Sequence, residues 1–204
     1  MKYNISDDFQ KLEEAGILPY GLIINVTSTQ NVNDFFVGDD DTEKYMMVEV
    51  TLENYIQKEN EEIHEVYGNA KCLLITTFDE VTGRTLNYMD VIDSIDQDTF
   101  NGLSVFMNHN CEFDSNLMFS QIFYIDKITI YEKYRNIGLG SILLEYLKYR
   151  FANLITAIVL QPLAFEVKDK GKELFDKESE RLCRFYKKHG FENYREKTWV
   201  YYEF

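Results

Sequence analysis

The segment from residue 122 to residue 151 constrains the fold of this chain more than any other. β-branched and aromatic residues fill the positions from Ile122 to Tyr131, with Asp126 and Lys127 as the only charged interruptions, which predicts a strand. Apolar residues then recur at helical spacing along one stripe, which predicts an amphipathic helix: Leu139, Ile142, Leu143, Tyr146, Leu147 and Phe151. A strand that passes through a glycine turn into a helix points unpaired backbone N–H groups at one spot, which is a phosphate-sized anion site.

The turn between these elements has the chemistry of such a site. Gly138 and Gly140 lack a Cβ, so the backbone can approach a ligand closely and can adopt positive φ if needed. Arg135 adds a fixed positive charge whose fork geometry suits phosphate oxygens. An ordinary strand-to-helix turn is the alternative interpretation of the two glycines alone.

Two common phosphate motifs are not present in this turn. A dinucleotide fingerprint needs a third small residue three positions after Gly140, and Leu143 stands there. A Walker loop needs Gly-Lys-Ser/Thr, whereas Gly140 is followed by Ser141 and Ile142. The sequence therefore supports neither a nicotinamide enzyme nor a P-loop NTPase.

The pattern Arg135-x-x-Gly138-x-Gly140 after a hydrophobic strand resembles the pyrophosphate-binding motif of the GNAT acetyltransferase superfamily. A later block, RFYKKHGF at 184–191, resembles the family's later helix, which ends in a tyrosine, basic residues and Gly-Phe. The apolar run 155–160 between them matches the expected strand. The resemblance covers about residues 117 to 204 and implies an α+β fold, with a central, mostly antiparallel mixed sheet flanked by helices.

The resemblance also implies an activity and a cofactor. We expect an N-acetyltransferase that moves an acetyl group from acetyl-CoA to a primary amine, of a small molecule or a protein, by direct attack. A non-catalytic acyl-CoA-binding sensor or scaffold is the alternative. The implied cofactor-binding residues are Ile128, Ile130, Arg135, Asn136, Gly138, Leu139, Gly140 and Ser141.

Two side chains are candidates for the proton transfers of such a reaction. Asp126 is the candidate base, since strand alternation predicts that it shares a face with Tyr124, Ile128 and Ile130. A surface carboxylate paired with Lys127 is the other interpretation of Asp126. Tyr186 matches the family tyrosine that protonates the leaving thiolate, although a merely buried aromatic side chain would also fit its position. By resemblance, a backbone N–H near Ile130 would stabilise the oxyanion.

Charge divides the chain unevenly and bears on its partners. Residues 121–204 hold 15 Lys/Arg and 12 Asp/Glu, whereas residues 1–120 hold 6 and 23, for a net charge of −14 overall. The basic part coincides with the predicted site for a polyanionic cofactor. The acidic bulk argues against nucleic acid; it would attract a cationic amine acceptor or serve solubility alone.

Length and composition limit how many domains the chain can form and where it is expected to act. Its 204 residues predict a single domain, with a divergent half at 1–116 on the acceptor side and the acetyl-CoA-binding core at 117–204. No membrane segment or signal peptide is evident, so a cytoplasmic protein is expected, as a monomer or homodimer. His109 and Cys111 have no second pair to complete a metal site, so no metal is expected.

Several other elements are predicted from local patterns. Helices are expected at 7–15, 53–65, 97–107 and 172–189, and strands at 22–26, 45–52 and 199–204. Loops are expected at 31–42 and 108–116, and a hairpin at 72–92 around Asp79 to Arg84.

Overall fold

The structure is a computed structural model of the chain. It describes residues 5–17, 21–29, 45–58, 61–76, 78–79, 84–85, 103–104, 107, 121–193 and 200–204. The predicted loops at 31–42 and 108–116, the second arm of the predicted hairpin at 86–92 and most of the predicted helix at 97–107 lie outside these residues.

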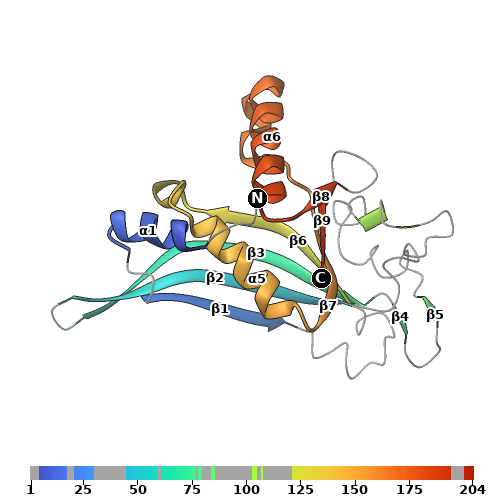
Figure 1. Cartoon of the computed structure of the whole chain (residues 1–204), viewed down its shortest axis with the longest axis horizontal. Helices are drawn as coiled ribbons and strands as arrows, with labels where there is room; N and C mark the ends of the chain where they lie inside the picture. The colour runs from blue at the N-terminus through green and yellow to red at the C-terminus, as the bar shows by residue number, and fades with distance from the viewer. Residues whose placement is uncertain are drawn as a thin grey trace.

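A seven-stranded sheet forms the centre of the described structure, in the order β1-β2-β3-β6-β7-β9-β8 (Figure 1). Its strands are β1 (Leu22–Thr29), β2 (Tyr45–Lys58), β3 (Glu61–Thr76), β6 (Gln121–Ile130), β7 (Ile155–Leu160), β8 (Glu192–Asn193) and β9 (Val200–Glu203). Only β6 and β7 pair in parallel; every other pair is antiparallel. The predicted α+β class with a mostly antiparallel sheet is confirmed.

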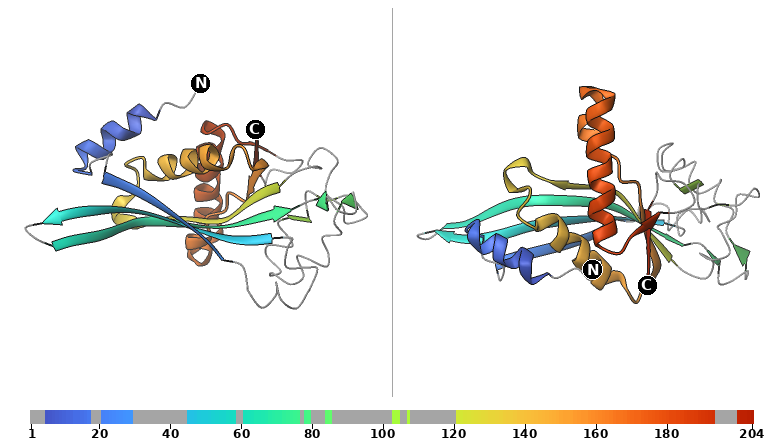
Figure 2. Two further views of the ribbon diagram at one scale, coloured as in Figure 1. Left: turned by 90° about the horizontal axis from the view of Figure 1, so that it is seen from below. Right: turned by 45° about the horizontal axis from the view of Figure 1, so that its top comes forward.

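The described helices are α1 (Ser6–Glu14), α5 (Leu139–Phe151) and α6 (Lys172–Lys188), with short 3-10 helices at Glu132–Tyr134 and Phe165–Lys170. Figure 2 shows α1 and α5 on the same face of the sheet, whereas α6 stands steeply across the strands. None of these described helices combines the length and apolarity that crossing a membrane requires.

The predicted stripe of α5 is the side of that helix that the core buries. Leu143, Leu144, Leu147 and Phe151 are buried in one cluster with Phe123 of β6, and the rings of Phe123 and Phe151 stack at 4.3 Å between centroids. Helical spacing puts these side chains on adjacent positions of one face, so burying them fixes α5 on the sheet.

One helix prediction is wrong. Residues 53–65 were expected to form an acidic helix, but β2 continues to Lys58 and β3 begins at Glu61. The two strands pair as far as Lys58↔Glu61, with Ile56 opposite Ile63. Strand pairing therefore overrides the local helix preference of the glutamates. The prediction failed because a local sequence pattern does not show which strand a segment will pair with.

The predicted hairpin is found only next to its turn. β4 (Phe78–Asp79) pairs antiparallel with β5 (Arg84–Thr85). Residues 72–76, expected in the first arm, belong instead to β3, which pairs with β2 and β6.

The feature that shapes the functional region is the parting of β6 from β7. The two strands pair from Gln121↔Ile155 to Ile125↔Leu160, and no described residue of β6 beyond Ile125 pairs with β7. On its other edge β6 stays paired with β3 as far as Ile130↔Gly68. Pro162, two residues after β7, suits this ending because proline cannot donate to a sheet ladder.

We predict that Leu147→Ala lowers the free energy of unfolding by about 2–5 kcal/mol, because Leu147 is fully buried in the core below α5. Leu154→Ala is the matched control: its side chain is 53% exposed, so the change should stay within about 0.5 kcal/mol. Chemical denaturation of the three proteins measures both values, and equal losses would contradict this description of the core.

Candidate functional site

A cavity of about 610 Å³ opens where β6 leaves β7. Its lining comes from β6, the turn before α5, the first turn of α5, the segment after β7, and α6, with two residues of α1. A cavity of this volume is of the size that holds small-molecule and cofactor ligands.

The half of β6 that lies beyond its pairing with β7 forms one wall of the cavity. Ile125, Asp126, Lys127, Ile128 and Ile130 line it. The register with β3 shifts here: Cys72 lies opposite Ile125 and Lys71 opposite Lys127, which leaves Asp126 as the extra residue of a bulge. Asp126 is exposed at that bulge. Simple alternation, on which the prediction of a shared face rested, therefore does not hold through Asp126.

The turn between β6 and α5 ends in two residues with positive φ. Asn136 has φ 67° and Gly138 has φ 96°, and Gly138 is the N-cap of α5. Asparagine and glycine are the residues that adopt this region most readily. The N-cap residue makes no side-chain bond to the first N–H groups of the helix, and these groups have no acceptor within the helix. The predicted glycine turn is therefore present and lines the cavity, whereas its binding of an anion stays a prediction.

Gly138 is also required for packing against α1. A Cβ at Gly138 would lie 2.5 Å from the Cβ of Asp8, so α1 approaches the turn too closely for any side chain there. Asp8 is 3% exposed and pairs with Lys11 at 2.7 Å, and both line the cavity. The sequence predicted a helix here but gave neither residue a role, because nothing local indicates which element α1 would meet.

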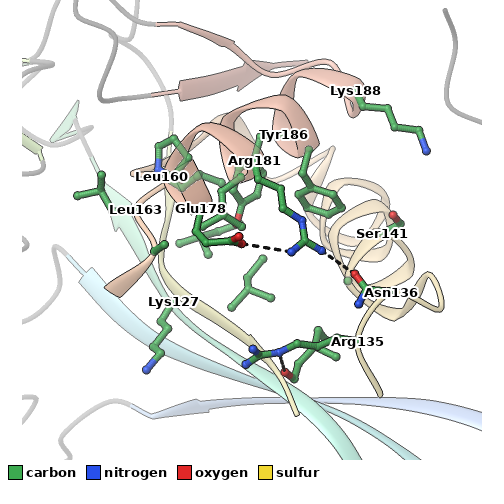
Figure 3. Close-up of a pocket in the computed structure, with 18 of the residues that line it drawn as sticks. Lys127, Arg135, Asn136, Ser141, Leu160, Leu163, Glu178, Arg181, Tyr186 and Lys188 are labelled. Atoms are coloured by element: carbon green, nitrogen blue, oxygen red, sulfur yellow. Dashed lines mark hydrogen bonds and ion pairs between the residues drawn. The ribbon is translucent and has the colours of Figure 1, made fainter. Parts of the chain in front are cut away.

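Positive charge gathers around the turn. Arg135 donates from Nε to the backbone oxygen of Ile130 at 2.8 Å, which fixes its guanidinium beside the end of β6. Arg181 of α6 donates to Oδ1 of Asn136 at 2.6 Å and pairs with Glu178 at 3.2 Å (Figure 3). The side chain of Arg181 thus joins α6 to the turn across the cavity.

Arg181 was missed by the sequence analysis. The later block of resemblance begins at Arg184, and Arg181 lies one turn before it on the same helix. In the sequence, only its place on the same predicted helix, five residues before Tyr186, relates Arg181 to the site. The cavity lining also includes three lysines: Lys11, Lys127 and Lys188.

Tyr186 is the buried residue of α6 that lines the cavity. It is 7% exposed, lines the cavity, and packs edge-on against Phe185 and Phe191 with centroid distances of 5.1 and 5.6 Å. Burial raises the pKa of its hydroxyl above the ordinary value, and the nearby Cys72 and Cys183 raise it further. The side chain therefore keeps its proton at neutral and mildly alkaline pH.

Most of the predicted site residues meet at this cavity. Its lining includes Asp126, Ile128, Ile130, Arg135, Asn136, Gly138, Gly140, Ser141 and Tyr186. Leu139 differs, because its side chain is 1% exposed and packs in a cluster with Leu12 and Ile142. The chemical roles of these residues stay predictions, whereas their proximity is a property of the structure.

Among the described residues, no three His, Cys, Asp or Glu side chains gather as a metal-binding group. His109 and Cys111 lie outside those residues.

No family model matches the sequence, and no curated protein matches it. Among solved structures, Arabidopsis thaliana NAA60 in complex with acetyl-CoA matches with a TM-score of 0.43 and 12% identity, over 89% of this chain and 98% of that chain. A GNAT-family acetyltransferase from Listeria monocytogenes matches with a TM-score of 0.36 and 13% identity, over 98% and 85%.

The motif Arg135-x-x-Gly138-x-Gly140 stays the feature by which the chain resembles GNAT acetyltransferases. A further match is the KacTA–DNA complex, with a TM-score of 0.42 and 9% identity over 89% of this chain and 92% of that chain. The expectation that this chain has no nucleic-acid partner is not tested and stays a prediction.

We predict that Gly140→Glu weakens acetyl-CoA binding by at least tenfold, because a carboxylate would fill the approach to the first turn of α5 and repel phosphate. Gly140→Ala is the matched control for folding: a Cβ there would lie 3.7 Å from Ile130 and 3.8 Å from Phe185, which is ordinary contact. Calorimetry on the three proteins measures the affinities. Unchanged affinity in the glutamate variant would exclude the turn as the phosphate site.

Proposed function

We propose that this chain is an acetyl-CoA-dependent N-acetyltransferase that acetylates a primary amine by direct attack. One observation carries the proposal: a single cavity joins the glycine turn before α5, the half of β6 beyond its pairing with β7 and a buried tyrosine. Each of these three parts matches one requirement of the reaction. The turn would bind the pyrophosphate of the cofactor, the strand would bind the thioester, and the tyrosine would protonate the leaving thiolate.

The turn fits the pyrophosphate of coenzyme A. The first N–H groups of α5 and the helix dipole favour an anion, and the guanidinium of Arg135 lies beside them. Asn136, Gly138, Leu139, Gly140 and Ser141 would contribute mainly through their backbone. Arg181, which bonds to Asn136, is a further cation within reach of this turn.

The half of β6 beyond its pairing with β7 fits the pantetheine arm and the acetyl group. Strand backbone that has lost its β7 neighbour offers N–H and C=O groups to an extended ligand, and Ile128 and Ile130 offer apolar surface. Bound acetyl-CoA would supply the activated thioester. A backbone N–H near Ile130 is the proposed oxyanion donor, and one good donor of this kind contributes about 3–4 kcal/mol.

The acceptor must lose a proton before or during attack. An alkyl ammonium group with a pKa of about 10.4 is only about one part in 2,500 free amine at neutral pH, which costs roughly 4.6 kcal/mol. Asp126 lines the cavity at the bulge and is the proposed base, directly or through water. The acidic first 120 residues would favour approach of a cationic acceptor.

The departing thiolate must gain a proton. Tyr186 is the proposed donor, because burial keeps its hydroxyl protonated and the side chain faces the same cavity as β6. The proton then passes from the phenol to the sulfur as the carbon–sulfur bond breaks, and the tyrosine is restored from solvent or from the amine-derived proton.

A panel of amines with acetyl-CoA, followed by thiol release, tests the proposal directly. Thiol release that depends on the amine supports an N-acetyltransferase, and mass spectrometry of the product then names the acceptor. Tight binding of acetyl-CoA with no release for any amine would favour the alternative, a non-catalytic acyl-CoA-binding module. Absence of coenzyme binding would overturn both.

We predict that Tyr186→Phe lowers kcat by about 10²-fold or more and leaves acetyl-CoA affinity nearly unchanged, because only the proton donor is lost. The ring keeps its packing against Phe185 and Phe191, so stability should be retained. Steady-state kinetics and calorimetry separate the two effects, and full turnover in the variant would remove Tyr186 as the acid.

We predict that Asp126→Asn lowers kcat by about 10²–10⁴-fold, because the amide cannot accept the amine proton. Glu180→Gln is the control for loss of one negative charge, since Glu180 is an exposed residue of α6 that pairs with Arg184. Its kcat should match that of the unaltered protein. Equal activity in both variants would assign the base to another group.

A further inference from the structure

A buried hydrogen-bonded chain connects the phosphate-binding turn to the end of α6. Nε2 of His189 lies 3.1 Å from Oγ of Ser141, and Nδ1 of His189 lies 2.7 Å from Oε1 of Glu145. Ser141 is in the first turn of α5 and lines the cavity, whereas the side chain of His189 is fully buried. The imidazole therefore sits directly behind one of the proposed phosphate ligands.

The geometry dictates which nitrogen carries the proton when His189 is neutral. A carboxylate only accepts hydrogen bonds, so Nδ1–H donates to Glu145. Nε2 is then an acceptor, and the hydroxyl of Ser141 must donate its hydrogen to it. In this state Ser141 has no hydrogen to give to a phosphate oxygen.

Protonation of the imidazole reverses the role of Ser141. With both nitrogens protonated, Nε2–H donates to Oγ of Ser141, and the hydroxyl hydrogen is released for another acceptor. The added positive charge also favours an anion at the start of α5. A phosphate at the turn and a proton on His189 therefore stabilise each other.

We propose that His189 is a positioning residue that takes up a proton when the pyrophosphate of the coenzyme binds, so that Ser141 can donate to a phosphate oxygen. This inference rests on the proposed function, because it assumes a phosphate at the first turn of α5. It assigns His189 and Glu145 a part in cofactor binding although His189 does not line the cavity.

The groups around His189 have opposing effects on its pKa, and the net effect in the free protein is a lowering. Burial lowers the pKa of His189 below its usual value, Glu145 raises it through the hydrogen bond and its charge, and Lys148 and Lys188 lower it. Lys148 also bonds to Glu145 at 3.0 Å and to the backbone oxygen of His189 at 2.9 Å, while its ammonium lies over the ring of Tyr202. The ring of Phe185 covers the imidazole at 4.7 Å.

The sign of the pH dependence follows from these states. The free protein has the lower pKa for His189 and the phosphate-bound protein the higher one, so binding takes up a proton between the two values. Coenzyme affinity should therefore rise as pH falls through this interval, by at most about tenfold per pH unit for one linked proton.

Calorimetry in buffers of different ionisation enthalpy counts the protons taken up. The probe is acetylated 3′-dephospho-coenzyme A, because the 3′-phosphate of the complete coenzyme would itself titrate near pH 6. We expect net proton uptake by the unaltered protein at pH values between the pKa of His189 in the free protein and its pKa in the complex, with tighter binding at the lower pH. Nitrogen NMR of the imidazole should show Nε2 becoming protonated when the probe binds.

Variants separate a positioning role from a structural one. His189→Gln should bind the probe without proton uptake, because its amide can donate to Ser141 at every pH. His64→Gln is the matched control, since His64 is an exposed residue of β3, and it should keep the uptake. Should His189→Gln fail to fold, the NMR measurement on the unaltered protein decides the question.

The outcomes distinguish this inference from the proposed function. Probe binding with no proton uptake, or with an unprotonated Nε2 in the complex, would overturn the role of His189 and leave coenzyme binding in place. Uptake of equal size in His189→Gln would also overturn it. No binding of the probe or of acetyl-CoA would overturn both proposals.

Discussion

The separation of β6 from β7 is the constraint on which the rest of this site depends. Pairing stops at Ile125↔Leu160, yet β3 holds β6 in the sheet for five further residues, to Ile130. The strand therefore stays in the sheet while one of its edges has no strand partner among the described residues. An unpaired backbone group that is also kept from water costs about 1–3 kcal/mol, so such an edge favours a ligand that supplies the missing hydrogen bonds.

The two helices beside this opening share one apolar cluster and are also joined by polar contacts. Leu143, Leu147 and Phe151 of α5 lie in this cluster with Tyr186 of α6, and Leu182 and Phe185 pack against it. His189, directly after α6, bonds to Glu145 of α5, and Lys148 bonds to the backbone oxygen of His189. The position of α6, which carries Arg181 and Tyr186, therefore depends on the core as well as on polar bonds at its C-terminal end.

The sequence predicted the region from β6 to α6 well, because each element there has a local signature. The apolar stripe of α5, the run 155–160 and the basic end of α6 are all visible within one window of residues. The turn at Gly138 was recognised from its glycines, although its close contact with Asp8 was not. What could not be predicted depends on partners distant in sequence: the β2–β3 pairing, the bulge at Asp126, and the arrival of Arg181 and Asp8 at the cavity.

The two parts of the chain contribute unequally to the cavity lining. Of the described residues that line it, only Asp8 and Lys11 come from the first 120 positions, and both belong to α1. Substitutions of Asp8 or Lys11 can therefore change one rim of the cavity without altering the strand, turn and helices that form its other described walls.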